Sequence, residues 1–249
     1  MEKKKKRRKW ILPVCAAAIL LLVIQPLYTL GINFSGPWRH LAVSKIVRKY
    51  PASDYQNGVV FYGASNFARW KDMENVISSY PVQNHGFGGS ADRDLIQYAD
   101  ELLYPYSPRI VVFQTGSNDY VQEEGTDAEK ELKCMNRKRE MFTAFHEQLP
   151  NARFVVMSGL LLPGRSEYLE LTREVNRQLE ALCEELDYLS FVDASDMTYQ
   201  DGKFAEELFV KDGIHLNSDG QRIWAEQYII PALDALCAQY GIPFGNEDD

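Results

Sequence analysis

Short apolar runs alternate with helical patterns along most of the chain. Five short runs begin near residues 58, 81, 109, 153 and 189; four of them are rich in Val, Ile, Leu or Phe, and the one at 81 is the short segment PVQNHG. Such runs are typical of strands buried on both faces of a sheet. Between them, apolar residues recur at the three- and four-residue spacing of helices. The alternation predicts βαβ units and one α/β domain with a five-stranded parallel sheet covered on both faces.

Three helices are expected with particular clarity. One runs from about Thr126 to Gln148. A second covers residues 167–186 and places apolar residues on one face, namely Tyr168, Leu171, Val175, Leu179, Leu182 and Leu186. The last covers residues 218–240 and contains Pro231, which has no N–H to donate and therefore predicts a kink.

The N-terminus joins a basic cluster to a long uncharged stretch. Residues 1–10 carry seven Lys or Arg and one Glu, and no charge follows until after Ile32. A run of about 23 uncharged residues from Trp10 is long enough to cross a bilayer. Basic residues stay on the cytoplasmic side, so we expect a single-pass anchor with the rest of the chain outside the cell. A cleaved signal peptide remains the main alternative, although no A-x-A site follows; a lipid-modified Cys15 is disfavoured by its early position after Val14.

The patterns divide the chain into five parts. They are a basic cytoplasmic segment (1–9), a transmembrane signal-anchor (10–32), a juxtamembrane linker with a helix (33–57), the α/β domain (58–241) and an acidic tail (242–249). The juxtamembrane helix is amphipathic and basic. It is compatible with lying on the membrane surface and with packing against the domain.

Charge and cysteine content narrow the function classes. The net charge of −8 combines +6 in the first ten residues with −14 in the remainder, and an acidic body argues against nucleic acid as a partner. Cys134, Cys183 and Cys237 form no C-x-x-C pair and are expected to be structural thiols. No metal-binding or nucleotide-binding motif is present, so we expect no metal and no cofactor.

Four polar motifs lie at loop positions: FYGASN after the first strand, NHGFGGS after the second, QTGSND after the third, and KDGIHLN before the last helix. In parallel α/β sheets, ligands bind at the carboxyl ends of the strands. Ser65, in the first motif, suits a nucleophile or a helix N-cap. His215 lies three residues after Asp212, a spacing that suits a base and the acid that orients it, or a surface turn.

Together these motifs resemble the four blocks of the SGNH/GDSL hydrolase superfamily, over roughly residues 58–236. The resemblance implies a three-layer α/β/α, flavodoxin-like fold and a Ser65–His215–Asp212 triad. It also implies an oxyanion hole formed by the Ser65 N–H, the Gly89 N–H and the Asn118 side chain. The first motif reads GASN where the family has G-D-S-L, a departure that blurs substrate analogies.

The resemblance implies a serine esterase or acylhydrolase. For an enzyme outside the cell, the expected substrate is an O-acyl ester of an envelope glycan or a lipid-like ester. An acyltransferase using the same triad and a non-catalytic binding module on the same fold are the alternatives. His85, beside the glycine-rich loop, is equally compatible with lining the pocket and with a structural role. The oligomeric state is not predicted.

Overall fold

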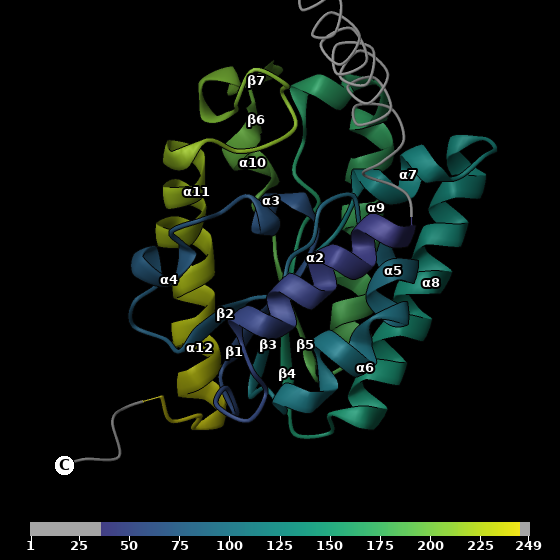
Figure 1. Cartoon of the computed structure of the whole chain (residues 1–249). Coiled ribbons are helices and arrows are strands. Elements are labelled where there is room, and N and C mark those ends of the chain that lie inside the picture. Colours follow the sequence, from purple (N-terminus) through teal and green to yellow (C-terminus); the bar gives the residue numbers. More distant parts are fainter. Residues whose placement is uncertain (1–35, 245–249) are drawn as a thin grey trace, which may run out of the picture. The chain divides into compact units, whose positions relative to one another are not determined.

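The computed structural model describes residues 36–244 (Figure 1). The chain divides into two compact units, Met1–Leu41 and Ala42–Asp249. The first unit is described only where helix α2 (Gly36–Lys49) begins, and the fold below belongs to the second. The predicted anchor, its cleavage and Cys15 fall outside the described residues, as does most of the acidic tail. No helix within the described part is both long and apolar enough to span a membrane.

The second unit is built on five parallel strands in the order β2-β1-β3-β4-β5. They are β1 (Val59–Gly63), β2 (Val82–Asn84), β3 (Ile110–Gln114), β4 (Arg153–Met157) and β5 (Leu189–Val192). Val60 lies opposite Gln83 on one side and Val111 on the other. This is the flavodoxin-like order, whose direction reverses at β1 and β3. The predicted five-stranded parallel sheet is therefore confirmed.

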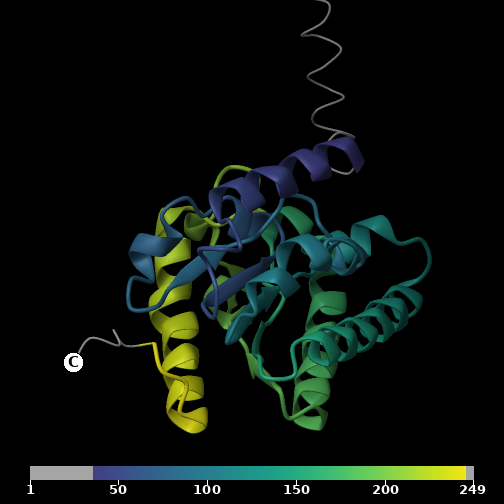
Figure 2. The same ribbon diagram turned by 60° about the horizontal axis from the view of Figure 1, so that its bottom comes forward.

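Alternate residues of the strands pack against helices on opposite faces. Val60, Val111 and Phe154 belong to one core cluster, which includes residues of α2, α5 (Asp92–Gln97), α6 (Ala99–Leu102), α8 (Asp127–Gln148) and α9 (Leu169–Glu185). Val59, Val112 and Val155 belong to the other, with residues of α4 (Met73–Val76), α11 (Ser218–Trp224) and α12 (Ile230–Tyr240). Figure 2 shows the yellow C-terminal helices and the green and teal helices on opposite sides of the sheet. The domain is thus a three-layer α/β/α sandwich.

Three helical segments depart from the sequence expectation. The segment after β1 divides into α3 (Ser65–Ala68) and α4, and the Asn84 side chain donates to the carbonyls of Phe67 and Trp70 around the end of α3. The segment after β2 divides into α5 and α6. In the last helix, the distortion expected from Pro231 is a π-helical turn at Ala225–Ile229, just before the proline.

Several short elements have no counterpart in the sequence expectation. They are α7 (Ser117–Gln122), α10 (Ser195–Thr198), the hairpin of β6 (Tyr199–Gln200) and β7 (Lys203–Phe204), and the 3₁₀ turns η2 (Tyr104–Tyr106), η3 (Pro163–Tyr168) and η4 (Glu206–Leu208). Two of them, α7 and η3, contribute to the site described below.

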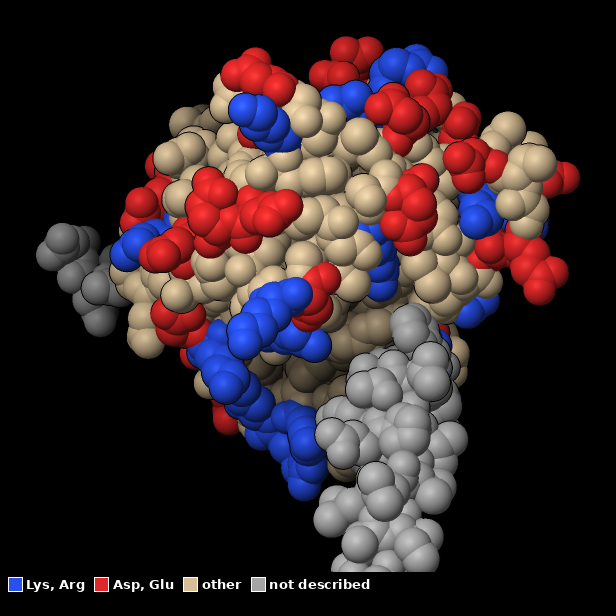
Figure 3. All heavy atoms as spheres, turned by 90° about the horizontal axis from the view of Figure 1, so that it is seen from above, with Lys and Arg blue, Asp and Glu red and all other residues tan. Residues whose placement is uncertain are grey.

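The described cysteines are free thiols, and the surface charge is unevenly distributed. Cys134 and Cys183 are buried, Cys237 is half-buried, and all three are free. Figure 3 shows Asp and Glu spread over the face seen from above, whereas the largest group of Lys and Arg forms a band along one edge. The face is therefore mixed in charge although the domain as a whole is acidic.

Candidate active site

The turn after β1 is pinned against the end of β3. A Cβ atom on Gly63 would lie 2.3 Å from the carbonyl oxygen of Gln114, so only glycine allows the two strands to approach this closely. The Ala64 N–H donates to the same oxygen at 3.2 Å. Ser65 then begins α3, and its side chain lies at the carboxyl edge of the sheet, where ligands of such sheets bind.

The structure brings Ser65, His215 and Asp212 into one hydrogen-bonded chain. The Oγ of Ser65 lies 2.8 Å from Nε2 of His215, and Nδ1 of His215 lies 2.7 Å from Oδ2 of Asp212. When Nδ1 carries the proton and donates to the carboxylate, Nε2 is left to accept the hydroxyl proton of Ser65. This is the arrangement that a serine nucleophile and its base require.

The loop that carries the base is held by its own hydrogen bonds. Oδ1 of Asp212 accepts from the N–H groups of Ile214, at 2.9 Å, and His215, at 3.0 Å. Gly213 supplies the positive φ of 63° that the turn requires. The three-residue spacing in the sequence thus lets one carboxylate close its own turn with one oxygen and orient the imidazole with the other.

A buried asparagine joins the nucleophile turn to this loop. Oδ1 of Asn66 accepts from the N–H of Leu216 at 3.1 Å. Asn66 stands where the family motif has leucine, and no role for it was expected from the sequence. Its hydrogen bond fixes the residue after Ser65 to the residue after His215.

The protonation states suit general-base chemistry. Burial is the largest influence on the pKa of His215 and lowers it; the Asp212 hydrogen bond opposes this, and the charge of Arg69 adds to the lowering. Burial alone would raise the pKa of Asp212, but hydrogen bonds from His215 and Ile214 outweigh it and the net shift is downward. At neutral pH the imidazole is therefore neutral and the carboxylate ionised.

Asn118 lies across the site in the first turn of α7, directly after β3. Its Nδ2 donates to the carbonyl of Ser90 at 3.0 Å, and its Oδ1 accepts from Nη1 of Arg165 at 3.1 Å. Contacts at both ends fix which way the amide faces. Ser65 and Asn118 line the same pocket. An amide held in this way is a fixed donor for a developing negative charge.

Gly89 lies next to Ser90, and it has a positive φ of 73°. The Gln122 side chain donates to its carbonyl at 3.3 Å. The glycine-rich loop is therefore tied to α7 through both Gly89 and Ser90. Gly89 is not among the residues that line the pocket with Ser65, so its part as an oxyanion donor rests on the family resemblance.

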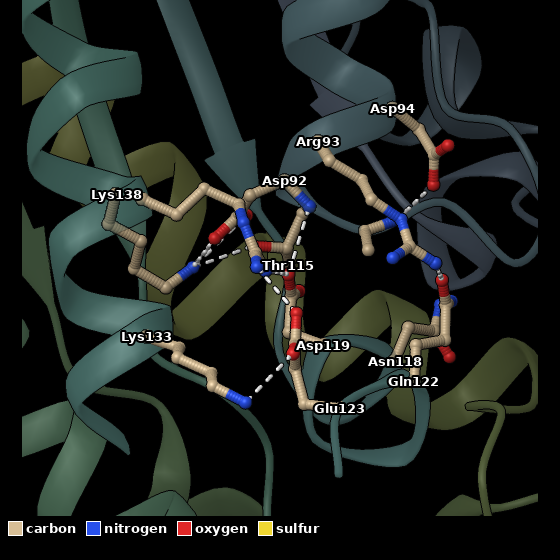
Figure 4. A network of polar contacts seen from close by, with 12 residues as sticks. Asp92, Arg93, Asp94, Thr115, Asn118, Asp119, Gln122, Glu123, Lys133 and Lys138 are labelled. Atoms are coloured by element: carbon tan, nitrogen blue, oxygen red, sulfur yellow. Dashed lines mark hydrogen bonds and ion pairs between the residues drawn. The ribbon is translucent and has the colours of Figure 1, made fainter. Parts of the chain in front are cut away.

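A buried ion network supports both of these loops, and Figure 4 shows its side chains. Nζ of Lys138, on α8, lies 3.0 Å from Oδ2 of Asp92 and 2.8 Å from Oγ1 of Thr115. Asp92 begins α5 after the glycine-rich loop, and Thr115 follows β3. The Asp92 N–H donates to Oδ1 of Asp119 at 3.1 Å, next to Asn118. The network holds the second and third motifs together.

Asp119 has an unusual environment. Its Oδ2 is buried with no hydrogen-bond partner, while Nη1 of Arg137 lies 3.3 Å from its Oδ1. Burial and then the negative charge of Asp92 raise its pKa, against the opposing charge of Lys138. Asp119 is thus a buried structural acid beside the candidate oxyanion donor.

His85 lies away from the pocket. Its Nδ1 donates to the carbonyl of Leu102 at 2.6 Å, and its ring packs against those of Tyr50 and Tyr106. Burial lowers the pKa of His85 to about 4, so the ring is neutral. The sequence left two roles for His85, lining the pocket or supporting the fold, and the structure shows the second. Among the described residues, no cluster of His, Cys, Asp and Glu is arranged to hold a metal ion.

Comparison with known proteins agrees with this geometry. The sequence profile of the GDSL-like Lipase/Acylhydrolase family matches residues 50–223. The fold is similar to a GDSL-like lipase from Bacteroides thetaiotaomicron (TM-score 0.60, 19% identity, 78% of this chain and 99% of that one). It is also similar to a Clostridium thermocellum family 3 carbohydrate esterase (TM-score 0.52, 16% identity, 72% and 98% covered).

A third similar structure is the C-terminal catalytic domain of a Streptococcus pneumoniae peptidoglycan O-acetyltransferase (TM-score 0.52, 14% identity, 73% and 94% covered). No curated protein matches the chain. At these identities the structural neighbours show a shared fold, and the family profile, which covers more than half of the sequence, shows the family. The chain belongs to the GDSL-like lipase/acylhydrolase family and is a hydrolase that acts on esters.

Proposed function

We propose that the chain is a serine esterase in which Ser65 is the nucleophile, His215 the general base and Asp212 the residue that orients it. The observation that carries the proposal is the continuous chain of two hydrogen bonds, 2.8 Å and 2.7 Å long, that links the three side chains. The lowered pKa of His215 supports it, because a base must be neutral to accept the hydroxyl proton.

The reaction follows from this geometry. Oγ of Ser65 attacks the ester carbonyl while Nε2 of His215 takes its proton, and Asp212 stabilises the imidazolium. The amide of Asn118, with the N–H groups of Ser65 and Gly89, holds the oxyanion. His215 then gives the proton to the departing alkoxide. The alcohol dissociates, and Ser65 remains as an acyl-serine. Water, activated by the same imidazole, releases the acid and restores Ser65.

Fluorophosphonate labelling and hydrolysis of a short-chain aryl ester test the triad. We expect Ser65→Ala to abolish labelling. Ser65→Ala and His215→Ala should each lower kcat by about 10⁴-fold or more, and the double variant should resemble either single one. Ser79→Ala, at an exposed serine, is the matched control and should keep full labelling and activity. Labelling that persists in folded Ser65→Ala would place the nucleophile elsewhere.

A second candidate is acyl transfer to a hydroxyl group on the same triad. The fold similarity to a peptidoglycan O-acetyltransferase domain supports testing it. In that reaction an acceptor alcohol replaces water in the second step. Adding increasing concentrations of a saccharide acceptor to an ester assay separates the two. Acylated acceptor forming in place of free acid would establish a transferase, whereas release of acid alone supports hydrolysis.

We further propose that the domain is anchored in the membrane by residues 10–32 and acts outside the cell on an O-acyl ester of an envelope glycan or a lipid-like ester. The basic cluster before the uncharged run supports this orientation. Protease added to intact protoplasts should degrade the domain. A protected domain, or a shortened species released into the medium, would contradict the anchor.

A further inference from the structure

A guanidinium group lies in the pocket beside Ser65. Arg165 lines this pocket together with Ser65 and Asn118. Its Nη1 donates to the hydroxyl of Ser117 and, at 3.1 Å, to Oδ1 of Asn118. Because Asn118 is the proposed oxyanion donor, the guanidinium is one side chain away from the place where the scissile carbonyl would be held.

In the part of the chain that the structure describes, the guanidinium of Arg165 is not held in a salt bridge. Within the described residues, no carboxylate forms an ion pair with it, and its Nε and Nη2 donate to no protein atom. Its two acceptors, a hydroxyl and an amide oxygen, are neutral. Burial is the largest influence on the pKa of Arg165 and lowers it, and it outweighs the more distant charges of Glu167 and Asp212, which raise it. N–H groups of the guanidinium thus remain for a ligand.

The backbone that carries Arg165 is fixed against the base loop. The N–H of Gly164 donates to the carbonyl of Gly213 at 2.9 Å, and a Cβ on Gly164 would lie 2.3 Å from the carbonyl oxygen of Asp212. Arg165 itself has φ −144° and ψ 40°, which interrupts the 3₁₀ turn. The guanidinium is therefore presented from a segment packed on the loop of Asp212 and His215.

A second arginine adds positive charge at the same place. Nη1 of Arg69, just after α3, lies 3.3 Å from Oδ2 of Asp212 and is largely exposed. The charges of Arg69 and Arg165 both act on His215. Two cations therefore lie at the reacting groups of a chain whose net charge is −8, and Asp212 offsets only part of their charge. A negatively charged ligand is the chemistry that this local field favours.

We propose that Arg165 forms a subsite for an anionic group, a carboxylate or phosphate, that the ester substrate carries close to its scissile bond. This inference rests on the proposed esterase function and names its substrate class. The planar guanidinium matches two oxygens of such a group, and charge-assisted hydrogen bonds are stronger than neutral ones. We expect kcat/KM to favour an anionic ester over its neutral isostere by about 10- to 100-fold.

Two pairs of esters, followed by acid release at constant pH with detergent-solubilised full-length protein, test the subsite. In the first pair, monomethyl succinate carries a charge on the acyl side and methyl succinamate is its neutral counterpart. In the second pair, acetylated glycerol 3-phosphate carries a charge on the alcohol side and monoacetin is the neutral member. We expect the wild type to prefer the anionic member of one pair, which identifies the side. Free succinate or glycerol 3-phosphate should also slow fluorophosphonate labelling of Ser65.

Variants of Arg165 separate recognition of the anionic group from the hydrogen bond that Arg165 donates to Asn118. Arg165→Gln should abolish the preference for the anionic ester and the protection by free anions, and Arg165→Lys should keep part of both. Loss of the Asn118 contact would slow both members of a pair equally, so the ratio of their kcat/KM values isolates recognition of the charge. Lys71→Gln removes an exposed cation near Arg69 and should leave the ratio unchanged.

The outcomes distinguish this inference from the function on which it rests. Equal rates within both pairs, a preference that survives Arg165→Gln, or an Arg165→Gln variant that slows both members equally would overturn the subsite while the esterase stands. A folded wild type that neither hydrolyses any of the four esters nor reacts with fluorophosphonate would overturn the esterase itself.

Discussion

Replacing Lys138 with methionine would remove the cation of the buried network and leave the carboxylate of Asp92 behind. The Lys138 side chain is 2% exposed and that of Asp92 is 0% exposed, so water cannot take the place of the ammonium. Among the described residues, the Thr115 hydroxyl, which donates to Oδ1 of Asp92, would then be the remaining side-chain donor to this carboxylate. Breaking a buried pair in this way typically costs about 3–5 kcal/mol. Because domains are stable by only about 5–15 kcal/mol, we expect a large loss of unfolding free energy.

Urea unfolding of the detergent-solubilised protein measures this loss, with the fluorescence of the buried Trp70 and Trp224 as the signal. The double variant Lys138→Met/Asp92→Asn has no unpaired charge and should regain at least about half of the loss. Lys133→Met, on the same helix, is the matched control. It removes an exposed cation from a pair with Glu123, and surface pairs contribute only about 0–1 kcal/mol.

Two results would refute this account of the network. One is a loss of less than about 1 kcal/mol in Lys138→Met, which would mean that the carboxylate is hydrated or otherwise compensated. The other is a double variant whose loss equals the sum of the two single losses, because independent sites add and coupled ones do not.

Three further predictions concern the site. The charge of Arg69 disfavours the imidazolium of His215, so Arg69→Gln should raise the pKa of His215 and move the acid limb of the kcat/KM–pH profile to higher pH; an unmoved limb would contradict this electrostatic role. Asn118→Ala should lower kcat by about 10²–10³-fold with KM nearly unchanged, and a raised KM with unchanged kcat would identify a ground-state contact instead. Gly164→Ala would force a Cβ to within 2.3 Å of the Asp212 carbonyl oxygen, so kcat/KM should fall by up to about 10²-fold; unaltered kinetics would show that the two loops are not mutually fixed.

The sheet and the candidate triad could be predicted because their signals are local. Most of the strands are short apolar runs, and the helical patterns between the runs predict that the strands are parallel. Ser65 follows a strand directly, and Asp212 and His215 are three residues apart, so each motif is visible in a short window. Helix α7 gave no such signal, because Ser117–Gln122 is too short to show periodicity.

The residues that were missed act over long separations. Lys138 and Asp92 are 46 residues apart. Lys138 stands in the charged stretch KCMNRKRE, where its residue type alone does not distinguish it from the neighbouring cations. A signal was nevertheless present, since Lys138 lies four residues after Cys134 and four before Phe142, on the buried face of α8. Arg165 offered none: it is a polar residue in a loop, and only the packing of Gly164 on the base loop shows where it is held.

The hydrogen bond between Asn66 and Leu216 has a consequence for when the enzyme becomes active. It joins residues 150 positions apart in the chain, as does the contact between Ser65 and His215. During synthesis, the proposed nucleophile therefore emerges long before the proposed base, and closing so long a loop waits for the C-terminal helices to dock on the sheet. A nascent or truncated chain that lacks His215 would have Ser65 without its proposed base, so we expect hydrolysis to begin only once nearly the whole domain has been made and folded.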